Sequence, residues 1–144
     1  MRYFVIAGEA SGDLHASNLI KSIKKEDADA LFCGLGGDLM EAEGVRLIRH
    51  YRDMAFMGFI PVLLHAKTIL GNIKACKEAI NEFIPDILIL VDYPSFNLKM
   101  AQFVKENISD VTVYYYISPK LWAWKEYRLK SMKRYVDKIF SILP

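Results

Sequence analysis

The sequence has few of the residues that bind metals or cross-link chains. Its two cysteines, Cys33 and Cys76, lack metal-ligand spacing, and both lie in apolar segments, where a free thiol usually acts as a small core residue. The three histidines, His15, His50 and His65, are scattered, with no i, i+4 pair or acidic companion that would make a metal site. These residues therefore predict reduced, structural cysteines and give no metal site.

Long hydrophobic runs are also missing. The longest apolar stretches, FIPVLLHA and DILILV, are well short of the roughly 20 residues that span a bilayer. The N-terminus turns polar at GEASGD, which is too early for a secretory signal peptide. With 144 residues, 53% of them hydrophobic and 25% charged, the chain has the composition of one soluble domain, and we expect it in the cytoplasm.

Positive charge is concentrated near the end of the chain. Residues 120–138 carry seven basic and two acidic side chains, a local net charge of +5 that leaves −3 for the rest. This predicts a patch for phosphate, anionic lipid or nucleic acid, although a solvated helix face explains it equally well. Trp122 and Trp124 lie in the same segment, and core packing, sugar stacking or a membrane interface would each shield them from water. No nucleic-acid signature accompanies them, so we expect no nucleic-acid partner.

Short β-branched or aromatic runs alternate with longer segments of helical period. The expected strands are residues 2–7, 30–35, 45–50, 87–91, 111–117 and 138–143. The expected helices are residues 13–25, 38–44, 59–84, 97–107 and 125–136. This alternation predicts an α/β fold, a Rossmann-like three-layer sandwich with a mainly parallel sheet. In such sheets ligands bind beyond the carboxyl ends of the strands, so the segments that follow the strands are the places to look for a site.

The helix expected at 59–84 shows two apolar patterns. One stripe, spaced by three and four residues, suits packing on the sheet and consists of Val62, Ala66, Ile69, Ile73, Cys76, Ile80 and Phe83. A second group lies off this stripe, on the side that carries Lys67 and Lys74, and consists of Ile60, Leu63 and Leu64, preceded by Phe56, Met57 and Phe59. An apolar patch edged with lysines can bind an acyl chain or lie on a membrane surface. Burial against a loop or a further domain is the other interpretation.

The segment GEASGD follows the first expected strand. Gly8 and Gly12 allow a tight turn and a close backbone approach, and Ser11 or Asp13 can cap the next helix. The spacing is not G-x-G-x-x-G, and Glu9 and Asp13 would repel a pyrophosphate, which argues against a dinucleotide site. Recognition of hydroxyl groups by these carboxylates and a capped structural turn both remain open.

Asp92 is the sharpest candidate for chemistry. It directly follows the apolar strand expected at 87–91, and Tyr93 and Phe96 rim it with aromatic surface. A carboxylate that is partly desolvated in this way suits general-base work. An Asx-turn that leads into Pro94 explains the same residue equally well.

Five segments together resemble one family. They are AGEASGDLHA, GLGGDLMEAEG, MAFMGFIPVL, PDILILVDYPSFN and YYYISPKLWAWKEYR, and they occur in family order over almost the whole chain. In combination they look like the N-terminal half of lipid-A-disaccharide synthases, which are glycosyltransferases of the GT-B fold. Residues 1–144 would then be the Rossmann-like acceptor-side domain, and the UDP-binding C-terminal domain would lie outside this sequence. We therefore expect this chain to bind the acceptor without turnover.

The resemblance implies an inverting hexosyl transfer in lipid A biosynthesis. The donor would be UDP-2,3-diacylglucosamine and the acceptor 2,3-diacylglucosamine 1-phosphate, with UDP and the β-1,6 lipid A disaccharide 1-phosphate as products. Enzymes of this kind are cytoplasmic and peripheral on the inner membrane surface. No metal and no cofactor are expected, because the UDP-sugar is a substrate, and a homodimer stays open.

The resemblance also implies roles for particular residues. Asp92 matches the family's essential aspartate and would be the base that activates the acceptor hydroxyl. The substrate-binding residues implied by the motifs are Glu9, Ser11, Gly12, Asp13, Met57, Gly58, Asn97 and Ser118. The apolar patch that contains Met57 would take acyl chains, and the basic run would meet the acceptor phosphate or lipid headgroups.

The sequence departs from the family pattern at two places. Ala16 and Ser17 replace a common Gly-Ala pair, and Lys120 and Lys125 stand in a motif that commonly reads SPSVWAWR. A lysine in place of arginine loses bidentate geometry.

Two other functions remain as alternatives. The first is another GT-B enzyme such as a UDP-sugar epimerase, whose soluble substrate leaves the apolar patch unexplained, and the second is a non-catalytic Rossmann-like module that binds a nucleotide or a protein.

Overall fold

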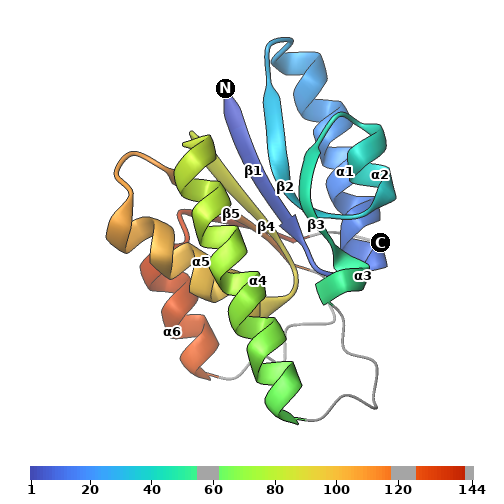
Figure 1. Cartoon of the computed structure of the whole chain (residues 1–144). Coiled ribbons are helices and arrows are strands. Elements are labelled where there is room, and N and C mark those ends of the chain that lie inside the picture. Colours follow the sequence, from blue (N-terminus) through green and yellow to red (C-terminus); the bar gives the residue numbers. More distant parts are fainter. Residues whose placement is uncertain (55–61, 118–125, 142–144) are drawn as a thin grey trace.

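The computed structural model describes residues 1–54, 62–117 and 126–141, and within them six parallel strands form one sheet (Figure 1). The strands are β1 (Arg2–Ala7), β2 (Leu31–Gly36), β3 (Arg46–His50), β4 (Ile87–Val91), β5 (Thr112–Ile117) and β6 (Lys138–Ser141). Their spatial order is β3-β2-β1-β4-β5-β6. The chain therefore builds outward from β1 in one direction, crosses back, and builds outward from β4 in the other. The topological switch point therefore lies at the carboxyl ends of the paired strands β1 and β4, where open α/β sheets bind ligands.

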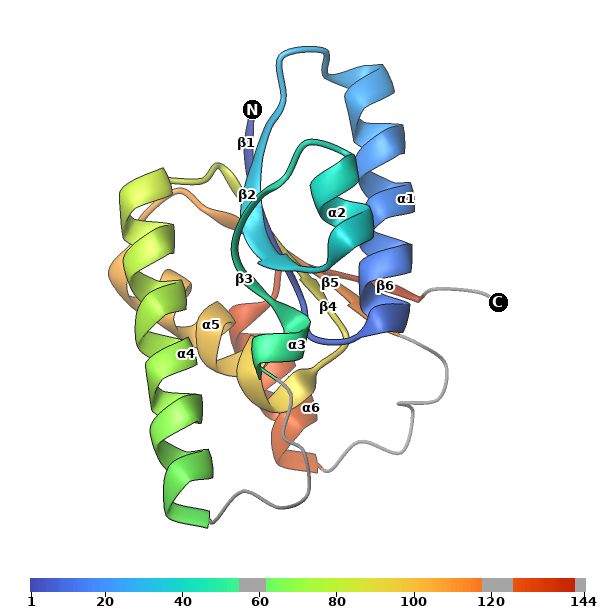
Figure 2. The ribbon, with the colours of Figure 1, turned by 45° about the vertical axis from the view of Figure 1, so that its right-hand side comes forward.

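Helices cover the sheet on two faces. They are α1 (Ala10–Glu26), α2 (Asp38–Ala42), α3 (Tyr51–Met54), α4 (Val62–Phe83), α5 (Pro94–Asn107) and α6 (Glu126–Tyr135). The first two lie on one face, and α4, α5 and α6 lie on the other (Figures 1 and 2). This arrangement confirms the predicted Rossmann-like α/β class, since right-handed crossovers place helices on opposite faces as the strand order reverses.

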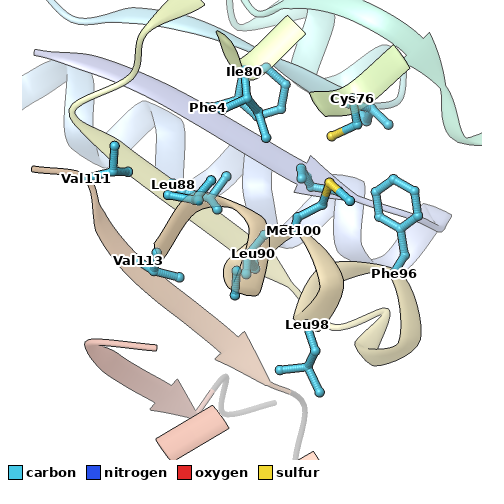
Figure 3. Close-up of a cluster of buried hydrophobic side chains, with 14 of the residues drawn as sticks. Phe4, Cys76, Ile80, Leu88, Leu90, Phe96, Leu98, Met100, Val111 and Val113 are labelled. Atoms are coloured by element: carbon cyan, nitrogen blue, oxygen red, sulfur yellow. The ribbon is translucent and has the colours of Figure 1, made fainter. Parts of the chain in front are cut away.

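The two central strands alternate between two apolar clusters. In β1, Phe4 and Ile6 face the layer of α4 and α5, where Leu88, Leu90 and Met100 join them (Figure 3). The alternate β1 residues, with those of β4, pack beneath α1 in a second cluster that includes Tyr3, Val5, Ala7, Ile89 and Val91. Burial on both faces is the reason why these strands read as unbroken apolar runs.

The helix α4 is longer than the sheet that it covers. At 22 residues it extends about 33 Å, whereas a five-residue strand spans about 17 Å. Its C-terminal half buries Cys76 and Ile80 against the sheet, as the apolar stripe predicts. Its N-terminal half projects past the carboxyl edge of the sheet (Figure 2), so Ala66 and Ile69 are exposed, and the prediction that they belong to the core is wrong.

The other sequence predictions agree with the structure in the type of most elements but differ from it at several helix boundaries. All six strands lie within one residue of their predicted starts. The first helix starts at Ala10 and not at residue 13, α5 starts at Pro94 and not at residue 97, and the short helix α3 was not predicted. Cys33 and Cys76 are free and buried, as predicted. Among the described helices, none combines the length and apolar content needed to cross a membrane.

Candidate functional site

The loops after β1 and β4 meet at the switch point. The register pairs Ala7 with Val91, which brings Gly8 next to Asp92. The ring of Tyr93 lies directly over Gly8, because a Cβ atom added to that glycine would lie 2.6 Å from two of the ring carbons. The first loop therefore needs glycine here, and the loop after β4 is docked on it.

Asp92 and Tyr93 adopt an unusual backbone conformation. Their φ angles are 46° and 50°, in the left-handed region that side chains other than those of Asn and Asp rarely adopt. Each left-handed residue costs about 1 to 2 kcal/mol, so the surrounding structure must hold this turn. Pro94 then starts α5, and its fixed φ suits the first turn of a helix.

Three hydrogen bonds hold the main chain of Asp92. Its N–H donates to the carbonyl oxygen of Tyr116 at 2.8 Å. Its own carbonyl oxygen accepts from Nδ2 of Asn97 at 2.7 Å and from the hydroxyl of Tyr115 at 2.6 Å. Asp92 is 5% exposed, and Asn97 and Tyr115 are fully buried. The predicted general base thus stands on a strained turn whose backbone is held by buried side chains.

The N-cap and the first turn of α1 contribute two exposed polar side chains. Ser11 donates from Oγ to Oε1 of Glu9 at 3.1 Å, and both residues face solvent at the carboxyl edge of the sheet. The prediction that Ser11 or Asp13 caps α1 is wrong, because the helix starts at Ala10 with Glu9 as its N-cap residue. Gly12 is buried where α1 approaches the sheet closely, since an added Cβ would lie 3.3 Å from Cβ of Ala7.

Asp13 caps a different helix from the predicted one. Its carboxylate is 3% exposed and accepts the backbone N–H groups of Gly37, Leu39 and Met40 at 2.9, 3.1 and 3.0 Å. These groups belong to the N-terminus of α2, so Asp13 fixes the loop after β2 to α1. Gly37 is close enough that an added Cβ would lie 2.6 Å from Oδ2 of Asp13. A sugar contact by Asp13 stays a prediction beside this structural role.

The aromatic side chains restrict which groups can act as a base. Burial raises the pKa of Tyr93, and it raises the pKa of Tyr116 together with a smaller effect of Tyr114. Both phenols therefore keep their protons near neutral pH. The described carboxylates at the switch point are those of Glu9, Asp13 and Asp92. Asp13 already accepts three backbone N–H groups and Glu9 is exposed, so Asp92 is the buried carboxylate that is left as the candidate base.

A small cavity opens between α1 and the carboxyl ends of β4, β5 and β6. It measures about 230 Å³ and is lined by His15, Asn18, Leu19, Val91, Tyr116 and Ser141. Drug-sized ligands occupy pockets of roughly 300 to 1,000 Å³, so this one suits only part of such a ligand.

The structure brings together most of the residues that the sequence singled out. Glu9, Ser11, Gly12, Asp13, Asp92 and Asn97 all lie on the loops and helix starts after β1 and β4. Met57, Gly58 and Ser118 lie outside the described residues. Tyr115 was missed, because the run of three tyrosines in β5 gives no sign of which one faces the turn; strand alternation puts Tyr115 on the face of α5.

A Rossmann-like α/β domain with a buried carboxylate at its switch point is the class that the fold and site define. The same fold occurs in a crystal structure of a UGT transferase from Siraitia grosvenorii in complex with UDP. The two match with a TM-score of 0.54 and 15% sequence identity, over 81% of this chain and 28% of that one. At this identity the likeness shows the fold alone.

The chain belongs to the lipid-A-disaccharide synthase family, because the family model described as lipid-A-disaccharide synthetase matches residues 3–144. Similar proteins include the lipid-A-disaccharide synthases of Myxococcus xanthus, 43% identical over 143 residues, and Geobacter metallireducens, 42% identical over 143 residues. Lipid-A-disaccharide synthase 1 of Legionella pneumophila is 38% identical over 143 residues. In each case the match covers 99% of this chain and 37% of the relative.

Proposed function

We propose that this chain is the acceptor-side part of a glycosyltransferase that makes the lipid A disaccharide. The observation that carries the proposal is the position of Asp92, a buried carboxylate on a strained turn at the switch point of the sheet. The proposed reaction is the one that resemblance to the lipid-A-disaccharide synthases implies, in which 2,3-diacylglucosamine moves from UDP to 2,3-diacylglucosamine 1-phosphate. The donor would be held mainly by a further domain, since the relatives are longer than this chain.

In this reaction Asp92 is the general base. Its carboxylate takes the proton of the acceptor 6-hydroxyl while that oxygen attacks the anomeric carbon of the donor. The bond between this carbon and the UDP oxygen breaks on the opposite face, so the configuration inverts and UDP leaves with the bonding electron pair. Glu9 and Ser11, exposed beside the turn, are suited to bind sugar hydroxyl groups.

The N-terminal half of α4, which projects past the sheet, binds the acyl chains of the acceptor and contacts the membrane surface. Ile69 and Leu70 are 37% and 65% exposed there, and Lys67 and Lys74 on the same helix are exposed as well. Because α4 begins at the carboxyl edge of the sheet, this apolar surface lies on the side of the molecule that carries Asp92 (Figure 2). Exposed apolar groups beside lysines favour an anionic lipid surface. We propose that the protein binds peripherally to the cytoplasmic surface of the inner membrane.

Binding to vesicles tests the membrane contact. Leu70→Ser should weaken binding of the chain to anionic phospholipid vesicles roughly tenfold, as expected for losing most of one leucine's burial. Leu31→Ser, at the start of β2 on the opposite edge of the sheet, is the matched control, since that leucine is 52% exposed. Equal vesicle affinity of Leu70→Ser and the unmodified chain would argue against this surface.

Turnover tests the role of Asp92. Asp92→Asn in a full-length synthase that carries this segment should lower kcat by at least roughly 100-fold, because the amide cannot accept the proton. Asp53→Asn, at an exposed carboxylate of α3, is the matched control and should keep its activity. Near-normal turnover of a folded Asp92→Asn enzyme would refute the general-base role.

A further inference from the structure

The turn that carries Asp92 is held by the buried side-chain amide of Asn97. Nδ2 of Asn97 donates to the carbonyl oxygens of Val91 and Asp92, at 3.3 and 2.7 Å. Its Oδ1 is buried and has no hydrogen-bond partner among the described residues. The NH₂ group of Asn97 thus binds the last two carbonyl groups before Tyr93.

The hydroxyl of Tyr115 is a second donor to the carbonyl oxygen of Asp92. It donates to the carbonyl oxygen of Asp92 at 2.6 Å, from a side chain that is fully buried. The two donors come from different elements, α5 and β5, so they hold the carbonyl oxygen from both the helix and the sheet. The backbone at Asp92 and Tyr93 is left-handed, and such a conformation persists only when its surroundings determine it.

We propose that Asn97 and Tyr115 are positioning residues for the proposed general base. Their N–H and O–H groups hold the carbonyl oxygen of Asp92, fix the left-handed turn, and thereby fix where the Asp92 carboxylate stands. A strained turn between a strand and a helix presents the nucleophile of α/β-hydrolases above their sheet in the same way. This inference rests on the proposed function, and it gives Asn97 a role in place of the substrate contact that the resemblance implied.

The test compares Tyr115→Phe and Asn97→Ala in a full-length synthase that carries this segment, with UDP-2,3-diacylglucosamine and the acylated acceptor as substrates. Each variant should lower kcat roughly 10- to 100-fold and leave KM for the acceptor nearly unchanged, because a misplaced base slows the chemical step and not the binding. Tyr114→Phe removes a hydroxyl one residue away on the other face of β5, and Asn107→Ala removes an exposed amide that bonds to Phe103. Both controls should keep kcat.

The outcomes separate this inference from the proposed function. Loss of kcat in Tyr115→Phe and Asn97→Ala, with urea midpoints like those of the two controls, supports the positioning role. Wild-type kcat in both variants overturns it, and so does a rise in KM for the acceptor at unchanged kcat, which would mark Asn97 as a substrate contact. Asp92→Asn is measured in parallel. If this variant keeps its turnover, the proposed function fails. If it loses turnover while Tyr115→Phe and Asn97→Ala keep the wild-type kcat, only the positioning inference is rejected.

Discussion

Replacing Asp13 by alanine should destabilise the domain by about 2 to 4 kcal/mol. The carboxylate accepts three backbone N–H groups at the start of α2, and those of Gly37 and Met40 are buried. Each buried donor left unpaired costs about 1 to 3 kcal/mol, and loss of a helix cap alone costs about 0.5 to 2 kcal/mol. Removing the buried charge regains part of this, because Asp13 no longer has to be desolvated.

Asp13→Asn keeps the shape of the side chain and changes its hydrogen bonds, so it shows how much of the stability loss comes from the hydrogen bonds. Its single oxygen can still accept from Gly37 and Met40, while its NH₂ group would face the N–H of Leu39, so we expect a loss of about 1 to 2 kcal/mol. Glu9→Gln, at the exposed edge, should change stability by less than about 0.5 kcal/mol. Equilibrium unfolding in urea, followed by far-UV circular dichroism, measures all three. The reasoning is refuted if Asp13→Ala lies within about 0.5 kcal/mol of the wild-type chain.

Three further perturbations test the packing and the electrostatics. Gly8→Ala should cost about 1 to 3 kcal/mol in urea unfolding because its methyl group meets the Tyr93 ring, and the added cost should largely vanish in a Tyr93→Ala background. Gly34→Ala should cost more than Gly8→Ala, since its Cβ would lie 1.8 Å from a carbonyl oxygen of β1. Burial alone raises the pKa of Asp137, but hydrogen bonds from Lys105 and a backbone N–H lower it below its ordinary value. The folded state then holds the ionised form more strongly than the unfolded state, so stability should fall as the pH drops below about 4, and Asp137→Asn should flatten that slope.

The sequence predicted the fold well because the signals for the strands are local. An unbroken apolar run such as Ile87–Val91 indicates a strand covered on both faces, and the structure buries all five of its residues. The charge that ends this run places Asp92 at the carboxyl edge of the sheet, where parallel strands present ligand sites. Strand alternation and the reversal of strand order then bring the loop at Gly8 beside it.

The contacts that shape the site could not be predicted, because they join residues far apart in the chain. Asp13 reads as a cap for its own helix, yet its partners lie 24 to 27 residues away at the start of α2. The hydroxyl of Tyr115 meets a carbonyl group 23 residues earlier, and the register of β4 and β5 decides that contact. Helix periodicity likewise gave no indication that α4 runs past the sheet, which depends on the lengths of the strands that it covers.

Acceptor binding by this chain is the most direct test of the proposed function. Isothermal titration should show saturable binding of 2,3-diacylglucosamine 1-phosphate and no binding of UDP over the same concentration range. Substitution of Glu9 or Ser11, the exposed polar residues beside Asp92, should weaken the acceptor titration. Binding of UDP without binding of the acylated sugar phosphate would contradict the acceptor-side assignment and favour a nucleotide-binding module instead.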